Sequence, residues 1–427
     1  MQIFMIMMII FIIAIFIGIP IAYCIGISGL VGLFISGISV EFVAKTVFTG
    51  LDSYTFLAIP MFILAGLIME KGGISNRLIK LATSLVGNVY GGLGIITVIA
   101  CFFFAAISGS SPATVAAIGA MMIPAMKEEG YDTAFAGALT AASGSMGVLV
   151  PPSVTMIIYA ITAEVSIGEL FLAGFVPGAL LTVCLIVTVY IIAKKNNYRS
   201  KKVERLSGKD FLKAVWNAKW SMLIPFIILG GIYSGIFTAT ESAIVAVVYA
   251  LVISIFVHKE LKFSQVPIIV AQAALTTSTV VIILGFAIAF ARYLTMAQIP
   301  QEFAKEILSL TNNVYVIYLM FIVLAFVAGT FMAIEAQILI FTPMFLPILK
   351  NLGVDPIHFG IIFIISAQIG FLTPPVGVNL FVAQGISNCS IVELSKRILP
   401  FLAAMTFAQM VLLIFPDIVM CLPRLFF

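Results

Sequence analysis

Two stretches of this chain of 427 residues repeat one another at a constant offset of 223 positions. The repeated residues are Pro124, Lys127, Gly130, Asp132, Gly137, Gly147, Pro151 and Pro152, which recur as Pro347, Lys350, Gly353, Asp355, Gly360, Gly370, Pro374 and Pro375. Both copies lie in apolar segments long enough to enter a bilayer, and each ends in a Gly-x-x-x-Pro-Pro sequence. Duplicated Gly/Pro interruptions in two hydrophobic halves are typical of the solute sites of secondary transporters.

The composition places the whole chain in a lipid bilayer. It is 62% hydrophobic and 9% charged, whereas soluble domains carry roughly 25% charged residues. At about 20 residues per span, there is room for about ten to twelve spans or their re-entrant equivalents. We therefore predict an all-α polytopic membrane protein, surrounded by lipid, in which the two halves are repeats.

Basic residues concentrate in a loop at 194–213. The positive-inside rule predicts that this loop is cytoplasmic; binding to nucleic acid or anionic lipid is the alternative, and we expect no nucleic-acid partner. Counting spans from the loop also places 71–80 and 258–262 in the cytoplasm, and 298–310 and 350–355 outside. This assignment makes the two halves inverted copies.

Each half contains two apolar arms that meet at a polar tip. The arms are about 15 to 17 residues long, short for a full crossing, so we predict re-entrant hairpins; two complete spans are the alternative. A segment broken at the Pro-Pro sequence follows each hairpin. The two tips are 108–112 and 329–337, and the two broken segments are 134–163 and 357–387.

These elements suggest a division into scaffold and transport parts. In each half we predict a scaffold part, which ends in an interfacial arm helix, followed by a transport part, which consists of a hairpin and its broken helix. A last span follows the second half. An amphipathic pattern at 71–86 predicts the first arm helix, and 298–310 the second. The boundaries of the five parts are 1–90, 91–165, 166–312, 313–388 and 389–427.

The chemistry is expected at the two breaks. Each Pro-Pro sequence removes helix donors and frees carbonyl groups upstream, and freed carbonyls in a water-filled break can bind a cation. Neutral oxygen ligands suit Na⁺, whereas Ca²⁺ sites usually recruit several carboxylates. An ordinary proline kink is the alternative. The predicted Na⁺ ligands are Ser108, Ser110, Ser111, Gly147, Val150 and Pro151 in the first half, and Gly329, Thr330, Gly370 and Thr373 in the second.

Polar residues between the two breaks are candidates for binding an oxygen-rich solute, aided by the positive ends of half-helix dipoles. A Ser or Thr in a membrane helix also commonly bonds its own i−4 carbonyl, which is the structural alternative. Glu335 is an intramembrane acid that either carries coupling charge or braces its hairpin. The candidates are Thr114, Ser153, Thr155, Glu335, Gln337 and Asn379.

Three further polar residues have structural explanations. Glu241 completes Thr238-x-x-Glu241, a capping box at the start of an apolar helix. Arg292 closes a span near the outer face, which favours an interfacial anchor over a substrate clamp. His358 follows Asp355-Pro356 at a helix start, and with two histidines in the chain a metal site or proton relay is a poor explanation.

With these residues in place, the chain resembles the large membrane subunit of TRAP transporters (tripartite ATP-independent periplasmic transporters). The resemblance extends from about Gly18 to the last span. It is carried by the segment from Ser108 to Gly119, by Gly235-Ile-Phe-Thr-Ala-Thr-Glu241, and by the two Gly/Pro breaks.

The resemblance implies an inverted-repeat elevator-type transporter in the cell inner membrane. It also implies a small four-helix membrane subunit and a periplasmic substrate-binding protein as partners, and Na⁺ as coupling ion. The implied substrates are organic acids, including C4-dicarboxylates and sialic acids, with a slight leaning toward sialic acid. The sequence does not identify the acid, the number of Na⁺ ions or the oligomeric state.

Two other classes of function compete with this expectation. A self-sufficient Na⁺/carboxylate symporter, or an ion antiporter of similar design, is the alternative within transport. An intramembrane enzyme would need a cluster such as H-E-x-x-H, and nucleotide hydrolysis would need a G-x-x-x-x-G-K-[ST] loop. Neither sequence occurs, so we predict that the chain is not an enzyme and has no organic cofactor.

Overall fold

A computed structural model describes residues 2–74, 77, 81–82, 86, 89–199, 208–374 and 377–427. These residues form helices and no strand; Tyr90 and Arg199 make one isolated antiparallel bridge. Much of the basic loop at 194–213, parts of the arm helix predicted at 71–86, and Pro375 lie outside the described residues.

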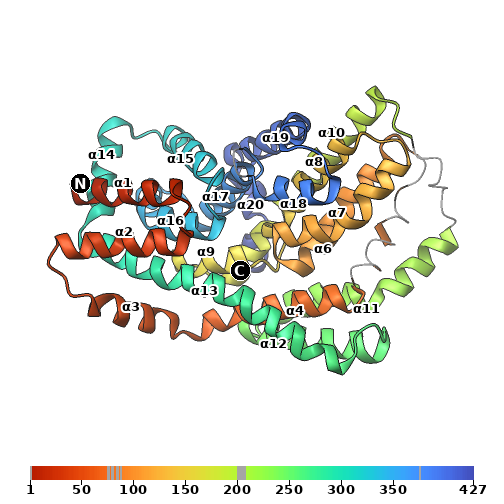
Figure 1. Cartoon of the computed structure of the whole chain (residues 1–427), viewed down its shortest axis with the longest axis horizontal. Coiled ribbons are helices and arrows are strands. Elements are labelled where there is room, and N and C mark those ends of the chain that lie inside the picture. Colours follow the sequence, from red (N-terminus) through yellow and green to blue (C-terminus); the bar gives the residue numbers. More distant parts are fainter. Residues whose placement is uncertain are drawn as a thin grey trace.

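The two halves have matching orders of helices (Figure 1). The first half contains α1 (Gln2–Phe16), α2 (Ile21–Ile35), α3 (Glu41–Leu51), η1 (Tyr54–Leu57), α4 (Ala58–Lys71), α6 (Gly92–Ser108), α7 (Ser111–Glu128), α8 (Thr133–Gly144), η2 (Ser145–Val148), α9 (Val154–Ala163) and α10 (Ile167–Lys195). The second contains α11 (Gly208–Tyr233), α12 (Ala239–Val252), η3 (Ile253–Val257), η4 (Phe263–Gln265), α13 (Val266–Met296), α14 (Ile299–Leu310), α15 (Val314–Gly329), α16 (Ile334–Asn351), α17 (Pro356–Phe371), α18 (Val378–Ser387) and α19 (Ile391–Ile414). Two short helices, α20 (Pro416–Met420) and α21 (Pro423–Phe426), end the chain.

The repeat read from the sequence is also a repeat of structure. Helices α7 and α16 begin and end at the same 223-residue offset. The aspartates of the repeat cap equivalent helices: Asp132 accepts a hydrogen bond from the backbone N–H of Ala134 at α8, and Asp355 from that of Ile357 at α17. A cap of this kind contributes about 1 kcal/mol. The same side chains therefore start the same helix in both halves.

Within the described part of the chain, six helical segments are long and apolar enough to cross a membrane. Among them are α10, α13 and α19, whereas α6 and α15 belong to the shorter apolar helices. These lengths agree with the predicted division into spans and short-armed hairpins, and the chain is a multi-pass membrane protein. Helix α11 runs from Gly208 to Tyr233, and the part of it that is apolar enough to cross a membrane begins at Val215.

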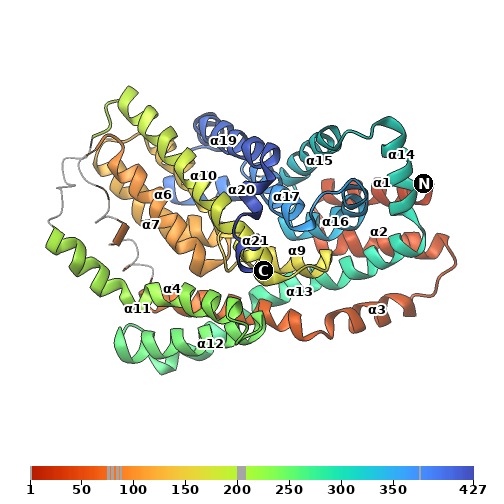
Figure 2. The same ribbon diagram turned by 180° about the vertical axis from the view of Figure 1, so that it is seen from behind.

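The helix that follows each break packs against the opposite half of the molecule, so the two halves exchange these helices. Helix α9 packs on α16 and α17 of the second half, and α18 packs on α7 and α8 of the first. Gly360 in α17 makes room for the ring of Tyr159, since a Cβ there would lie 2.3 Å from it. Figures 1 and 2 show the hairpins on opposite sides of these central helices. The breaks of both halves therefore lie in one core.

The remaining helices border this core. In both views α13 crosses the lower half of the molecule above α3 and α12, and it packs on α2, α3, α4 and α16. Two segments assigned to the cytoplasm, 71–80 and 258–262, contact one another through the ion pair of 2.7 Å between Arg77 and Glu260. The parity count thus groups loops that are neighbours in space.

Candidate functional site

The first hairpin tip rests on the first break through its backbone. Gly109 adopts φ +58, a left-handed conformation that suits glycine, and turns the chain from α6 into α7. Gly147 in η2 lies so close to this tip that a Cβ on it would be 2.4 Å from the carbonyl oxygen of Ser110. A Cβ on Gly109 would be 3.0 Å from the carbonyl oxygen of Pro152. Tip and break therefore form one unit.

Hydroxyl groups of this tip form a compact network. The hydroxyls of Ser108 and Thr114 are 2.7 Å apart, and Thr114 donates to the carbonyl of Ser110 over 2.8 Å. Thr114 is fully buried. The network gathers several neutral oxygen atoms beside Gly147, at the position where the sequence predicts a Na⁺ site.

The second tip repeats the contact with different side chains. A Cβ on Gly370 would lie 2.8 Å from the Cα of Gly329 and 2.3 Å from the carbonyl oxygen of Phe326. Nearby, Thr330 donates its proton to Val327 O over 2.8 Å, and Thr373 donates to Ile369 O over 2.8 Å. Their oxygen lone pairs remain available to a cation. Thr373 thus makes an i−4 bond, as does Thr114 to Ser110 O, and for the solute candidate Thr114 this is the structural alternative that the sequence analysis named.

The break after Gly147 ends in a capped helix. Val150 donates its backbone N–H to Met146 O over 2.9 Å. Ser153 is the N-cap of α9: its hydroxyl accepts from the backbone N–H of Met156 and donates to Val148 O over 2.7 Å. Pro151 and Pro152 separate these two groups and are buried. Ser153 therefore has a structural role that the sequence pattern did not reveal.

Ser111 connects the halves instead of remaining with the other tip residues. Its hydroxyl oxygen accepts a hydrogen bond of 2.9 Å from Gln368 Nε2 and one of 2.6 Å from Asn379 Nδ2. All three side chains are buried, and among the described residues the amide oxygens of Gln368 and Asn379 have no hydrogen-bond partner. Two buried acceptor oxygens without a donor are suited to a cation or to a hydroxyl-bearing ligand. Sequence reasoning missed Gln368, although an amide in a long apolar run was a usable signal.

The other candidate side chains lie on α9 and α16. Thr155 donates to a carboxylate oxygen of Glu335 over 3.3 Å, which joins the two exchanged elements. Gln337 is fully buried; its Nε2 donates to Met332 O over 3.3 Å, and its Oε1 has no partner. Glu335 therefore braces its hairpin against α9, one of the two roles expected for it.

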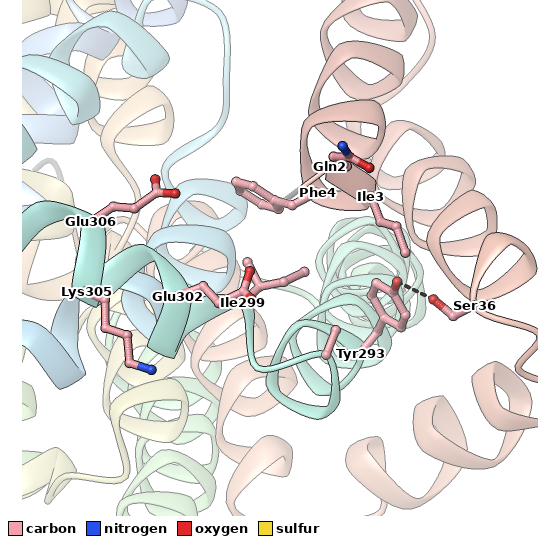
Figure 3. A pocket seen from close by; sticks show the side chains of 10 residues that line it. Gln2, Ile3, Phe4, Ser36, Tyr293, Ile299, Glu302, Lys305 and Glu306 are labelled. Carbon is pink, nitrogen blue, oxygen red and sulfur yellow. Dashed lines mark hydrogen bonds between the residues drawn. The ribbon is translucent and has the colours of Figure 1, made fainter.

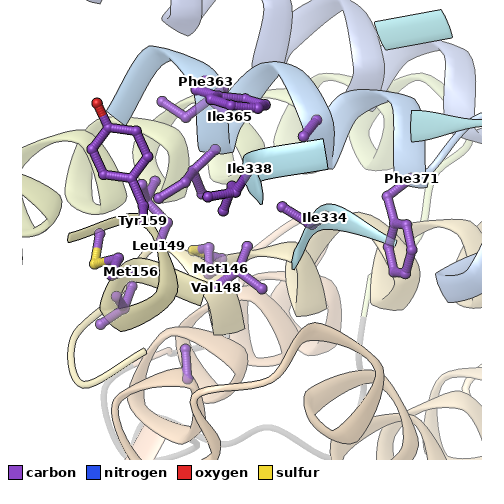
Figure 4. Packing of buried hydrophobic residues seen from close by; sticks show 14 of the residues in the cluster. Met146, Val148, Leu149, Met156, Tyr159, Ile334, Ile338, Phe363, Ile365 and Phe371 are labelled. Carbon is purple, nitrogen blue, oxygen red and sulfur yellow. The ribbon is translucent and has the colours of Figure 1, made fainter. Parts of the chain in front are cut away.

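Apolar side chains seal the space between the breaks (Figure 4). Met146, Val148 and Leu149 of the first break lie opposite Ile334 and Ile338 of α16. All five are at most 4% exposed. The polar groups described above therefore lie in an otherwise apolar core, where unpaired polar atoms cost more than they do in water.

The structure places the three residues for which the sequence offered a structural explanation, and it confirms the capping box. Thr238 and Glu241 form a complete capping box at α12. His358 bonds Tyr318 and the carbonyl of Leu412, at 2.9 and 3.0 Å. Arg292 borders two cavities where α3 and α13 approach the exchanged helices.

A separate cavity of about 780 Å³ lies between α1, the end of α13 and α14 (Figure 3). Tyr293 and Ser36 close one side of it with a hydrogen bond of 2.7 Å, and Glu302, Lys305 and Glu306 lie on α14. Its described lining residues include none of the predicted site residues. The cavity is remote from the hairpin tips, so we do not assign the transport chemistry to it.

Comparison with known families gives one clear match. The family model "Tripartite ATP-independent periplasmic transporter, DctM component" matches residues 8–418. In the search of solved structures, the YdaH transporter of Alcanivorax borkumensis aligns with a TM-score of 0.67 at 14% identity, covering 88% of this chain and 87% of that one. At this identity the likeness concerns the fold.

Three relatives indicate the range of cargo. The isethionate TRAP transporter permease protein DctMQ of Oleidesulfovibrio alaskensis is 45% identical over 91% of this chain, which spans 61% of that protein's length. The C4-dicarboxylate TRAP transporter large permease protein DctM of Pseudomonas aeruginosa is 40% identical over 93% of both chains. The sialic acid TRAP transporter large permease protein SiaM of Vibrio cholerae is 35% identical over 96% of both.

Proposed function

Because the chain belongs to the DctM component family of tripartite ATP-independent periplasmic transporters, we propose that it imports an organic anion by Na⁺-coupled, elevator-type transport. It is a large TRAP permease subunit and not an enzyme. The proposal concerns the coupling ion, the motion and the cargo. It also includes a place in the cell inner membrane, with a small membrane subunit and a periplasmic binding protein as partners.

The observation that carries the proposal is the pair of backbone contacts at Gly147 and Gly370. Each places a hairpin tip on a broken helix at the same position of the repeat. Non-helical backbone inside a membrane is tolerated where it lines a cavity or binds a ligand. Two such places, each with hydroxyl oxygens beside it, support two Na⁺ sites: one at Ser108, Ser110 and Gly147, and one at Thr330, Thr373 and Gly370.

The cargo is proposed to bind between these sites. The unpartnered amide oxygens of Gln337, Gln368 and Asn379 can accept hydrogen bonds from hydroxyl groups. The positive ends of α9 and α18 favour a carboxylate or a sulfonate. The relatives support three classes of cargo: isethionate, C4-dicarboxylates and sialic acid.

Uptake by proteoliposomes tests the proposal. The chain is reconstituted with its small subunit and binding protein, and labelled isethionate, succinate and N-acetylneuraminate are supplied under a Na⁺ gradient or an equal K⁺ gradient. We expect Na⁺-dependent uptake of at least one acid. Equal uptake under both gradients would contradict Na⁺ coupling. Uptake without the binding protein would favour the self-sufficient symporter.

A further inference from the structure

Two adjoining cavities lie where the predicted scaffold meets the exchanged helices. One, of about 320 Å³, is lined by residues of α3, α9, α13 and α16, including Gly50, Thr162, Arg292, Thr295, Leu339 and Pro343. The other, of about 420 Å³, continues between α3 and α13 and includes Lys45, Thr46 and Thr49. Gly50, Ile288 and Arg292 line both cavities, so they form one groove, which we name the Arg292 groove. Its volume is in the range of small-molecule sites.

The charge of the groove is positive. Arg292 and Lys45 are exposed, and in the described part of the chain no ion pair is formed by either. None of the described lining residues of the groove is acidic. A cationic side chain that lines a groove and has no counter-ion among the described residues is a candidate for ligand binding. A planar guanidinium also matches the geometry of carboxylate and sulfonate groups.

Three of the four threonine hydroxyls of the groove donate within their own helices. Thr49 donates to Lys45 O over 2.8 Å, Thr162 to Ile158 O over 2.7 Å, and Thr295 to Ala291 O over 2.9 Å. The fourth, on Thr46, donates no hydrogen bond within the described part of the chain and can supply one donor to an anion. Recognition of an anion therefore depends mainly on the charges of Arg292 and Lys45, while the oxygens of the other three threonines can accept from hydroxyl groups of the same ligand.

The position of the groove connects it to the core. Thr162 lies two helical turns from Thr155 on α9, a rise of about 10 Å, and Leu339 lies about one turn, or about 6 Å, from Glu335 on α16. Two walls of the groove, α3 and α13, belong to the predicted scaffold parts, and the other two, α9 and α16, to the predicted transport parts. A ligand in it would contact both.

From this geometry we infer that the Arg292 groove receives the carboxylate or sulfonate group of the transported acid, with Arg292 as its principal ligand and Lys45 as the second. The inference rests on the proposed function and adds a subsite on the scaffold. It replaces the expectation that Arg292 is an interfacial anchor. Anionic lipid phosphate offers the same charge, and the experiment separates the two sources.

Uptake kinetics give the first test. Arg292→Gln, Arg292→Lys and, as a distant control, Lys194→Gln are reconstituted with the partner proteins in vesicles of phosphatidylcholine, with or without phosphatidylglycerol. For any of the three acids that the unmodified chain takes up, we expect Arg292→Gln to raise KM at least about tenfold. Arg292→Lys should recover part of this loss, and Lys194→Gln should leave KM unchanged. An unchanged KM for Arg292→Gln, or an effect seen only with phosphatidylglycerol, would overturn the inference.

A second measurement does not depend on transport. Thr46→Cys is labelled with an anionic sulfonatoethyl or a cationic trimethylammonioethyl methanethiosulfonate, alone and combined with Arg292→Gln. We expect Arg292 to favour the anionic reagent at least about threefold, and isethionate to slow that reaction. If the ratio of the anionic to the cationic labelling rate is the same with and without Arg292→Gln, the inference is overturned. If the unmodified chain takes up none of the acids, the proposed function fails. The ratio of labelling rates still shows whether Arg292 attracts anions to the groove.

Discussion

Gly147 and Ser110 meet through their backbones: a Cβ on Gly147 would lie 2.4 Å from the carbonyl oxygen of Ser110 and 2.8 Å from Thr114 Oγ1. Gly370 stands in the same relation to Gly329, with a Cβ-to-Cα distance of 2.8 Å. Both glycines lie at the start of a break. The contact between hairpin tip and broken helix therefore depends on the absence of a side chain.

Gly147→Ala is expected to displace the first tip. The added methyl group overlaps backbone atoms that cannot rotate away, so we expect the free energy of unfolding to fall by about 1 to 3 kcal/mol. We also expect Na⁺-dependent uptake to be lost, since the Ser108–Thr114 network would move. Thermal unfolding in detergent and uptake in vesicles measure the two effects.

Gly385→Ala is the matched control for this substitution. Gly385 lies within α18, and a Cβ added to it would have no neighbouring atom within 4 Å. Because alanine is the better helix former, stability should stay the same or rise by about 0.5 to 1 kcal/mol. Equal destabilisation by both substitutions would show that the contact at Gly147 is not the cause.

Ser111→Ala is expected to remove an acceptor that two buried amides share, although Asn379 Nδ2 keeps its second bond, to Ala141 O. Gln368 Nε2 and Asn379 Nδ2 both donate to the Ser111 hydroxyl, and a buried unsatisfied donor costs about 1 to 3 kcal/mol. We expect a comparable fall in the free energy of unfolding. Ser278→Ala is the control, because Ser278 is exposed and donates to Leu275 O within α13.

A double-mutant cycle with Gln368→Leu separates this pair from general damage. If the hydrogen bond exists, the two substitutions should couple by about 0.5 to 3 kcal/mol. Strictly additive effects would mean that Ser111 and Gln368 do not interact, and that the link between the halves is made elsewhere.

Thr373→Val is expected to weaken Na⁺ binding at the second break. Valine keeps the shape of threonine but lacks the oxygen whose lone pairs would face the cation, so we expect the Na⁺ concentration for half-maximal uptake to rise about tenfold or more, about 1.4 kcal/mol. Thr276→Val is the control, because Thr276 makes the same i−4 bond, to Gln272 O over 3.1 Å, in exposed α13. An unchanged Na⁺ dependence for Thr373→Val would remove this residue from the site.

The repeat made much of the fold predictable. The hairpin arms, the two broken segments and the capping box at Thr238 and Glu241 follow local rules that act within one or two helical turns. Because the two halves repeat at an offset of 223 residues, each element predicted in one half also predicts its counterpart in the other. The contacts at Gly147 and Gly370 follow from the same reasoning, because a glycine placed identically in both copies indicates close backbone approach.

Long-range packing was not predictable in the same way. The exchange of α9 and α18 between the halves decides that Ser111 meets Gln368 and Asn379. No local pattern contains that pairing. Arg292 was assigned to the interface from its position at the end of a span, whereas the groove that it lines is formed in part by α3, a short helix that the apolar pattern did not show.

His258 is expected to make stability depend on pH. It follows the α12 span, and its Nδ1 lies 3.2 Å from Gly72 O. Burial and then the charge of Arg77 lower the pKa of His258 below its usual 6.5. The unfolded chain therefore binds a proton on His258 more readily than the folded chain does. The contribution of neutral His258 to the free energy of unfolding is fully present above about pH 6.5, and it declines as the pH falls toward the lowered pKa.

Thermal unfolding between about pH 5 and 8 measures this dependence, with His258→Gln as the comparison. Glutamine is neutral throughout and can still donate to Gly72 O. The difference in melting temperature between the two proteins should change below about pH 6.5, to the disadvantage of the unmodified chain. A constant difference across the range would exclude His258 as the titrating group.

Elevator motion predicts that a bond between α4 and the first hairpin stops transport. A Cβ on Gly66 would lie 3.7 Å from the Cα of Ser108, so cysteines at these two positions can approach the Cβ separation of about 3.5 to 4.5 Å that a disulfide needs. Because Ser108 is also a proposed Na⁺ ligand, uptake is measured at saturating Na⁺ and is compared with that of the reduced double variant. We expect oxidation of Gly66→Cys/Ser108→Cys to abolish this uptake and reduction to restore it. The reduced double variant and each oxidised single variant are the references. Undiminished uptake by the fully cross-linked protein would show that the hairpin does not move against α4, and transport would then require a local gate at the tips.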